Sequence, residues 1–168
     1  MRISEKLTAV AMAFGVALVL AITPTKSDAA TVLSNNEVKL VQESWTVIEK
    51  QMPGAIERFY RRYFQLDPAA KSLFDEKTMR VQYDAFANIL ADVAENSDDL
   101  AQFSNRMKRL GALHENLGAE PHQFALFGVA FVDTLRLELK TEFKPRARTA
   151  WNKIFYELSK MMEAGYSG

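Results

Sequence analysis

The chain has 168 residues, which suits one domain with a single core, and its 21 basic residues balance 21 acidic ones. This balance gives no indication of nucleic acid or another polyanion as a partner. The sequence contains no cysteine, which excludes disulfides, thiolate metal ligands, iron–sulfur clusters and a cysteine nucleophile. It also carries no glycine-rich phosphate-binding pattern, so we expect no nucleotide site.

The first 30 residues differ in composition from the rest of the chain. A short basic head precedes an apolar run over residues 7–22, and Ser27 and Ala29 are small residues of the kind that a signal peptidase accepts. The run is short for a bilayer span of about 20 residues. We therefore predict that residues 1–30 are a secretory signal peptide, with a retained membrane anchor through residues 7–22 as the alternative. In either case residues 31–168 form an exported domain, periplasmic or secreted, or held at the membrane by that anchor.

The next part of the chain predicts two long helices and one short helix. Ser34 and Glu37 have the spacing of a capping box at the start of the first helix, and the Met-Pro-Gly segment at 52–54 is expected to end it. The second helix carries an apolar stripe at helical spacing. The Asp-Pro pair at 67–68 then provides a cap and a first-position proline for a short helix that ends near Phe74.

Four further long helices complete the chain, and no segment alternates in the manner of a half-buried strand. Their boundaries are set by turn residues, caps and prolines. The first of the four begins near Thr78 and ends at the break at 95–99, and the second runs from Leu100 to Gly118. The third begins at Pro121, and the last follows Pro145 and ends at Gly165. We predict an all-α domain with six long helices and at least one short one.

Three polar residues occupy positions on the apolar faces of these helices: Tyr60, Gln82 and His114. A buried polar group without a partner costs about 1–3 kcal/mol, so three of them on different helices favour one shared polar site inside the core. The alternative is that each side chain simply bonds to a nearby backbone carbonyl. Periodicity alone indicates a helical bundle with a candidate polar pocket and does not identify an occupant.

The chain resembles a globin over residues 33–165, and two segments carry most of the resemblance. In the segment FYRRYFQLDPAAKSLF, Tyr60, Pro68 and Phe74 resemble the second globin helix, the proline that opens the third helix, and the phenylalanine that packs against the haem. The segment LGALHENLG resembles the proximal helix, with His114 as the iron ligand. Trp45 resembles the tryptophan of the first globin helix. The last two helices resemble the final globin pair in length and aromatic content. The resemblance implies the globin fold, a three-on-three helical sandwich around haem.

The bacterial single-domain haemoglobins and the globin domain of flavohaemoglobins are the subfamily that the chain resembles most. They typically carry tyrosine at the position of Tyr60 and glutamine at the distal position, which we align with Gln82. A one-residue slip would place Val81 there instead, and Ala85 in place of Phe86. In that subfamily a tyrosine ten residues after the proximal histidine, together with a glutamate on the last helix, bonds to the proximal imidazole. Here that position is Phe124, and the glutamate has no clear counterpart.

The resemblance implies haem b as cofactor and His114 as its iron ligand, with the Nδ1–H group of the imidazole held by the carbonyl of Leu110. It implies O₂ as the ligand, with NO and CO as further diatomic ligands. The residues expected to surround the haem are Tyr60, Phe74, Gln82, Phe86, Leu110, His114, Leu117 and Phe124.

Three functions are compatible with this site. The first is reversible oxygen binding for transport or storage, with Tyr60 and Gln82 donating hydrogen bonds to the bound gas. The second is a nitric oxide dioxygenase that depends on an external electron donor, an activity that Phe124 and the lack of a reductase sequence make less efficient. The third is a gas sensor or interaction module. We predict the first, a globin that binds O₂ tightly.

Overall fold

The computed structural model describes residues 31–167, so the predicted signal peptide or anchor lies outside the described residues and stays a prediction. The described part contains six α-helices, short 3₁₀ turns and no strand, which confirms the all-α prediction. None of its helices is long and apolar enough to cross a membrane. The helices are α1 (Asn35–Ile48), α2 (Met52–Leu66), α3 (Met79–Glu95), α4 (Ser104–Asn116), α5 (Pro121–Leu139) and α6 (Pro145–Glu163).

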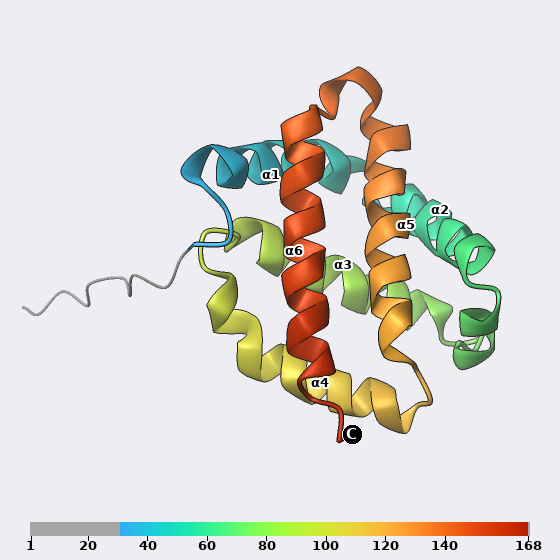
Figure 1. Cartoon of the computed structure of the whole chain (residues 1–168). Helices are drawn as coiled ribbons and strands as arrows, with labels where there is room; N and C mark the ends of the chain where they lie inside the picture. The colour runs from blue at the N-terminus through green and yellow to red at the C-terminus, as the bar shows by residue number, and fades with distance from the viewer. Residues whose placement is uncertain (1–30, 168) are drawn as a thin grey trace, which may run out of the picture.

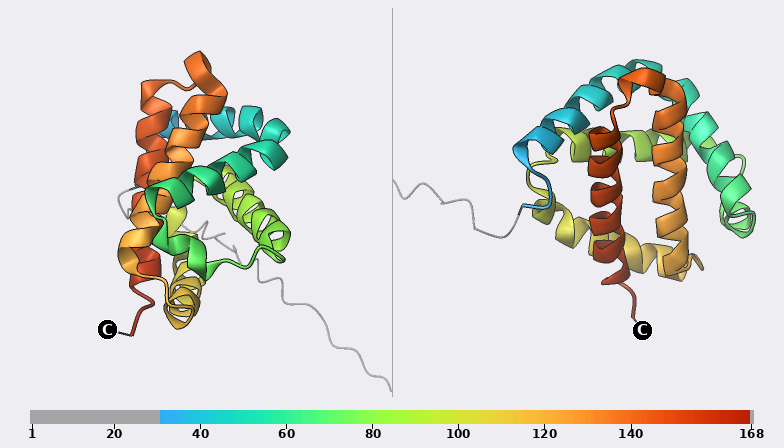
Figure 2. Two further views of the ribbon diagram at one scale, coloured as in Figure 1. Left: turned by 90° about the vertical axis from the view of Figure 1, so that its right-hand side faces the viewer. Right: turned by 45° about the horizontal axis from the view of Figure 1, so that its top comes forward.

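Helices α5 and α6 stand side by side in the domain and run in opposite directions, joined by a short turn at one end (Figure 1). Helices α1 and α2 cross this pair near that turn, and α4 crosses its opposite end (Figures 1 and 2). Helix α3 lies behind, in contact with α1 and α2. The arrangement leaves α4 packed mainly against α6, a contact on which the candidate site depends.

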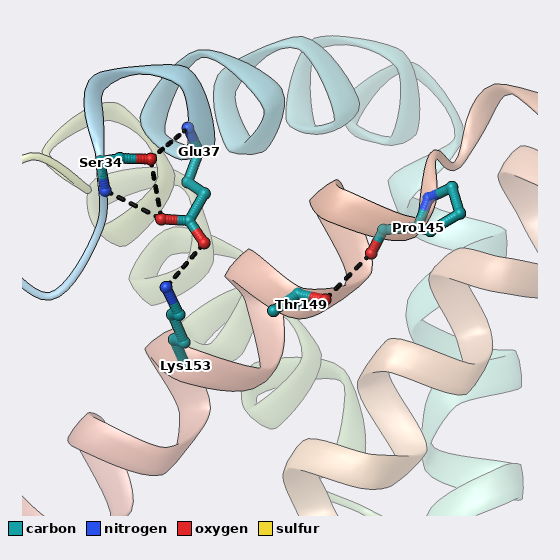
Figure 3. A network of polar contacts seen from close by, with 5 residues as sticks. All are labelled: Ser34, Glu37, Pro145, Thr149 and Lys153. Atoms are coloured by element: carbon teal, nitrogen blue, oxygen red, sulfur yellow. Dashed lines mark hydrogen bonds and ion pairs between the residues drawn. The ribbon is translucent and has the colours of Figure 1, made fainter.

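The start of α1 shows the predicted capping box. The Ser34 backbone N–H donates to Glu37 Oε2 at 2.9 Å, and the Glu37 backbone N–H donates to Ser34 Oγ at 3.4 Å (Figure 3). The second carboxylate oxygen of Glu37 accepts a hydrogen bond from Lys153 Nζ at 2.7 Å. The cap therefore also joins α1 to α6, and these donors lower the pKa of Glu37 to about 2, the Lys153 hydrogen bond most of all.

Two of the predicted boundaries can be compared in detail. The expectation that residues 52–54 end the first helix is wrong, because α1 ends at Ile48, a 3₁₀ turn spans Glu49–Gln51, and residues 52–54 form the first turn of α2. Proline is accepted there because the first N–H groups of a helix have no intrahelical partner. The predicted cap at Asp67 is confirmed, since its carboxylate accepts from the Ala70 N–H at 3.2 Å.

Aromatic rings from three helices form the centre of the core. Phe59 of α2 lies 4.9 Å from Phe86 of α3 and 4.6 Å from Phe127 of α5, measured between ring centroids, and Phe86 lies 4.7 Å from Phe127. The rings meet edge-on or tilted, the geometries in which each aromatic pair contributes about 1 kcal/mol beyond its buried area. This cluster fixes α2, α3 and α5 relative to one another on one side of the candidate site.

Two glycines allow α4 and the end of α6 to touch backbone to backbone. A Cβ atom on Gly111 would lie 1.9 Å from the Met162 carbonyl oxygen, and one on Gly165 would lie 2.0 Å from the Lys108 carbonyl oxygen. Both distances are far below van der Waals contact, so no other residue fits without moving a backbone. The distance between α4 and α6 is therefore set by the absence of side chains at these two positions.

We expect Gly111→Ala to destabilise the protein by about 3 kcal/mol or more, because its methyl group must push α4 away from α6. Thermal unfolding followed by circular dichroism measures the effect. Gly54→Ala is the matched control, since a Cβ at Gly54 meets only the flexible Arg58 guanidinium, at 2.9 Å. There the better helix propensity of alanine should leave stability unchanged or slightly raised. Equal melting temperatures for Gly111→Ala and the wild type would contradict this account of the crossing.

A second prediction concerns pH. The pKa of Glu37 is lowered from 4.5 to about 2 in the folded chain, so the ionised carboxylate stabilises the fold above the unfolded pKa, and this contribution disappears as the pH falls from about 4.5 towards 2. Glu37→Gln should therefore lower the free energy of unfolding by about 1 kcal/mol at pH 7, with the difference from wild type shrinking below pH 4.5. Urea titrations across this range test it, with exposed Glu49→Gln as control. A difference that persists unchanged at pH 3 would argue against the assignment.

Candidate functional site

A cavity of about 330 Å³ lies between α3, α4, α5 and α6, and its walls are mostly apolar. Seven of the eight side chains predicted to form the site line it: Phe74, Gln82, Phe86, Leu110, His114, Leu117 and Phe124. They come from segments up to 50 residues apart in sequence (Phe74 to Phe124), so the fold brings together what the sequence separates. A mostly apolar cavity with a few convergent polar groups is the usual form of a cofactor or ligand site.

His114 is held in one tautomer by its own helix. Its Nδ1 atom lies 2.8 Å from the carbonyl oxygen of Leu110, one turn earlier on α4. A carbonyl oxygen only accepts hydrogen bonds, so Nδ1 carries the proton and Nε2 keeps its lone pair. This confirms the predicted hydrogen bond. The Phe124 ring meets the imidazole edge-on, with 5.7 Å between the centroids, and restricts its rotation.

The end of α4 closes directly on the backbone of His114. Gly118 has a φ of +84°, and the Ala119 N–H donates to the His114 carbonyl oxygen at 2.9 Å, while the Gly118 N–H donates to Glu115 at 2.9 Å. These bonds are the two that define a Schellman motif, and the left-handed φ explains the glycine. The helix therefore ends in a rigid turn three residues after His114.

Gln82 is half-buried and lines the cavity, whereas Val81 is 70% exposed. The next positions on α3 that line the cavity are Ala85, Phe86 and Ile89, which follow Gln82 by three, four and seven residues, as one face of an α-helix requires. Of the two side chains considered for the distal position, Gln82 is the one that the cavity brings beside His114.

Tyr60 is the one predicted residue that does not line the cavity. Its side chain is 1% exposed and packs behind two lining residues, with its ring 5.6 Å from Phe74 and 6.1 Å from Phe86. Its hydroxyl has no hydrogen-bond partner of ordinary geometry. Burial raises the pKa of Tyr60, and the nearby Gln82 amide partly offsets the rise. A buried hydroxyl without a well-formed hydrogen bond costs free energy.

Sequence reasoning missed a second polar group at the cavity, formed by Tyr63 and Gln123. Both line the cavity, and Gln123 Nε2 donates to Oδ2 of the buried Asp67 at 2.7 Å. Burial and the Asp67 carboxylate raise the pKa of Tyr63. Asp67 was interpreted only as a helix cap, and a capping glutamine in the first turn of α5 gives no periodic signal. The other histidine, His122, lies outside the cavity lining and pairs with Glu120 at 3.2 Å.

Comparison with known proteins agrees with this geometry. The globin family profile matches residues 57–162. A flavohemoprotein of Vibrio cholerae is 24% identical over 132 residues, which cover 77% of this chain and 33% of that protein. The anaerobic nitrite reductase NSHB5 of Oryza sativa is 24% identical over 133 residues, which cover 75% of this chain and 90% of that protein.

The structure of a bacterial globin from Campylobacter jejuni superposes with a TM-score of 0.68 at 16% identity, covering 79% of this chain and 96% of that one. This likeness shows the fold. The chain spans only about a third of the flavohemoproteins that it matches, 33% in Vibrio cholerae and 31% in Bacillus subtilis. The family profile, by contrast, covers more than half of the 168 residues, and the chain therefore belongs to the globin family.

Proposed function

We propose that this chain binds haem b, with His114 as the iron ligand, and that it binds O₂ as its main gaseous ligand. The single observation that carries the proposal is the 2.8 Å contact between His114 Nδ1 and the Leu110 carbonyl oxygen at a mostly apolar cavity, which leaves Nε2 as the free ring nitrogen. A metal-ligating histidine nearly always makes such a bond through its other ring nitrogen, because the bond orients the ring and leaves the ligating nitrogen deprotonated.

The residues around His114 fit haem better than a directly bound metal ion. Within residues 31–167, no group of three or more His, Cys, Asp or Glu side chains is arranged to hold a metal. A single imidazole suffices when a porphyrin supplies the remaining equatorial ligands. The exposed leucines at the cavity edge, Leu113 and Leu117, present apolar surface of the kind that a haem edge would cover.

When bound, haem would supply an iron that takes O₂, NO or CO. The chain would contribute hydrogen-bond donors to that gas, the Gln82 amide at the cavity wall and the Tyr60 hydroxyl behind the lining residues. The Tyr60 hydroxyl lies in an environment with little competing water, where a hydrogen bond to a polarised ligand contributes about 1.5 kcal/mol. Together, two such donors slow the release of O₂ by roughly two orders of magnitude.

A nitric oxide dioxygenase is the second candidate function. The same Tyr60 and Gln82 donors favour it, and relatives of the chain are named flavohemoproteins. This activity needs electrons from a separate donor. Sustained consumption of NO with a supplied reductase and NADH distinguishes it from oxygen binding, because a single reaction of an oxygenated globin with NO shows competence only.

His114→Gly should abolish the five-coordinate, histidine-ligated ferrous spectrum of the haem-reconstituted protein, because it removes the one ligand that the chain provides. Added imidazole should restore that spectrum by filling the space left by the side chain. Absorption spectra of the ferric, dithionite-reduced and CO-bound forms measure both effects. His122→Gly is the matched control and should retain the wild-type spectrum. A wild-type chain with no Soret band after reconstitution would refute the proposal.

Tyr60→Phe should raise the O₂ dissociation rate about tenfold, the loss of one hydrogen bond of about 1.5 kcal/mol. Gln82→Leu should act in the same direction. Stopped-flow displacement of O₂ by CO measures the rates, and Tyr156→Phe, at an exposed position on α6, should leave them unchanged. If Tyr63→Phe accelerates dissociation while Tyr60→Phe does not, then Tyr63 is the donor and the assignment of Tyr60 is wrong.

A further inference from the structure

The segment that follows α6 binds the end of α4 through side-chain hydrogen bonds. The Tyr166 hydroxyl donates to the carbonyl oxygen of Ala119 at 2.8 Å. The backbone N–H and the hydroxyl of Ser167 donate to the Glu115 carboxylate, the hydroxyl at 2.8 Å. Figures 1 and 2 show this end of the chain beside α4. These contacts join residues 47 and 52 apart in sequence, and they meet α4 at the residue that follows His114 and at the turn after the helix.

These bonds act on the peptide groups that hold His114. The carbonyl oxygen of Ala119 accepts the hydrogen bond from the Tyr166 hydroxyl. The N–H of the same residue donates to the His114 carbonyl oxygen at 2.9 Å and closes the Schellman turn. The carbonyl and the N–H of Ala119 belong to adjacent peptide units, so fixing the former restrains the latter. Glu115 is the direct neighbour of His114 in the helix. Tyr166 and Ser167 therefore restrain the chain at two positions on the C-terminal side of the histidine, the residue next to it and the turn that ends its helix.

The same segment reaches the imidazole through a row of rings. The Tyr166 ring lies 5.9 Å from the Phe124 ring, and the Phe124 ring lies 5.7 Å from the imidazole, both edge-on. At Gly165 the backbone packs directly against the backbone of α4, because a Cβ there would overlap the Lys108 carbonyl. Burial and then the Glu115 carboxylate raise the pKa of Tyr166, so its hydroxyl keeps its proton near neutral pH.

We propose that Tyr166, supported by the Ser167–Glu115 contact, is a positioning residue for His114: it sets the orientation of the imidazole and thereby the strength of the iron–histidine bond. This inference rests on the proposed function, since it assigns a role toward the haem iron to residues that do not touch it. It assigns the restraint on the imidazole to the end of the chain, whereas the subfamily that the chain resembles carries a tyrosine at the position of Phe124.

The test compares Tyr166→Phe with Tyr156→Phe in the full chain, reconstituted with iron protoporphyrin IX. Both replace a tyrosine near or on α6, but only Tyr166 bonds to the turn after His114. In Tyr166→Phe we expect a shifted iron–histidine stretching band in the resonance Raman spectrum of the ferrous protein, and haem loss to an acceptor globin about tenfold faster. Tyr156→Phe should match the wild type in both measurements.

An unchanged iron–histidine band in Tyr166→Phe overturns the proposal, whatever the thermal midpoint of the variant, because a purely structural residue lowers stability without altering that bond. The same shift in Tyr156→Phe would also overturn it. If Tyr166→Phe does not fold, Glu115→Gln decides by the same two readouts. If the wild type binds no haem, or if His114→Gly keeps the band, the proposed function fails and this inference fails with it. A histidine-ligated wild type with an unshifted Tyr166→Phe refutes the inference alone.

Discussion

The backbone contact between α4 and α6 at Gly111 determines where His114 lies. With no side chain between the two helices, α4 is held at a distance that no rotamer change adjusts, and His114 follows Gly111 by three residues, nearly one helical turn. The hydrogen bond from its Nδ1 to Leu110 then fixes the ring on that rigid helix. A metal ligand needs this order of restraints, because a ligand mounted on a loosely packed helix would lose its geometry with each fluctuation of the helix.

The polar groups around the cavity differ in how well they are satisfied, and this difference separates structure from function. Asp67 and Gln123 bond to each other and to backbone groups, so their burial has no outstanding cost. The Tyr60 hydroxyl makes no hydrogen bond of ordinary geometry and has only the Gln82 amide nearby, so its burial carries an uncompensated desolvation cost. A fold retains such a cost where a ligand compensates for it. This asymmetry supports the proposal that a gaseous ligand is bound on the side of Tyr60 and Gln82 rather than at the Asp67 pair.

Periodicity and capping rules were sufficient to predict six helices, the Gly118 turn and the inward orientation of His114, because each depends on residues within one or two turns, but they misplaced the end of the first helix. They were insufficient for the distinction between Tyr60 and Tyr63, which share one apolar stripe of α2. Which of the two borders empty space depends on Phe74 and the other rings that pack against them from distant segments. The Tyr166 contact was missed for the same reason, since its partner Ala119 lies 47 residues away.

The group that accepts the hydrogen bond from His114 Nδ1 bears on whether a globin of this kind retains bound O₂ or cleaves its O–O bond. A carboxylate partner on Nδ1 gives the imidazole anionic character and increases electron donation to the iron, which favours cleavage of an O–O bond. In this chain the acceptor is the neutral Leu110 carbonyl. The nearby carboxylate of Glu115 is occupied by Ser167, and Glu163 is exposed on the outside of α6. The position from which a tyrosine would reach the imidazole holds Phe124, which offers only a ring edge. If His114 binds the haem iron as proposed, these contacts orient the imidazole without adding electron density to it, which favours the proposed binding of intact O₂ over its cleavage.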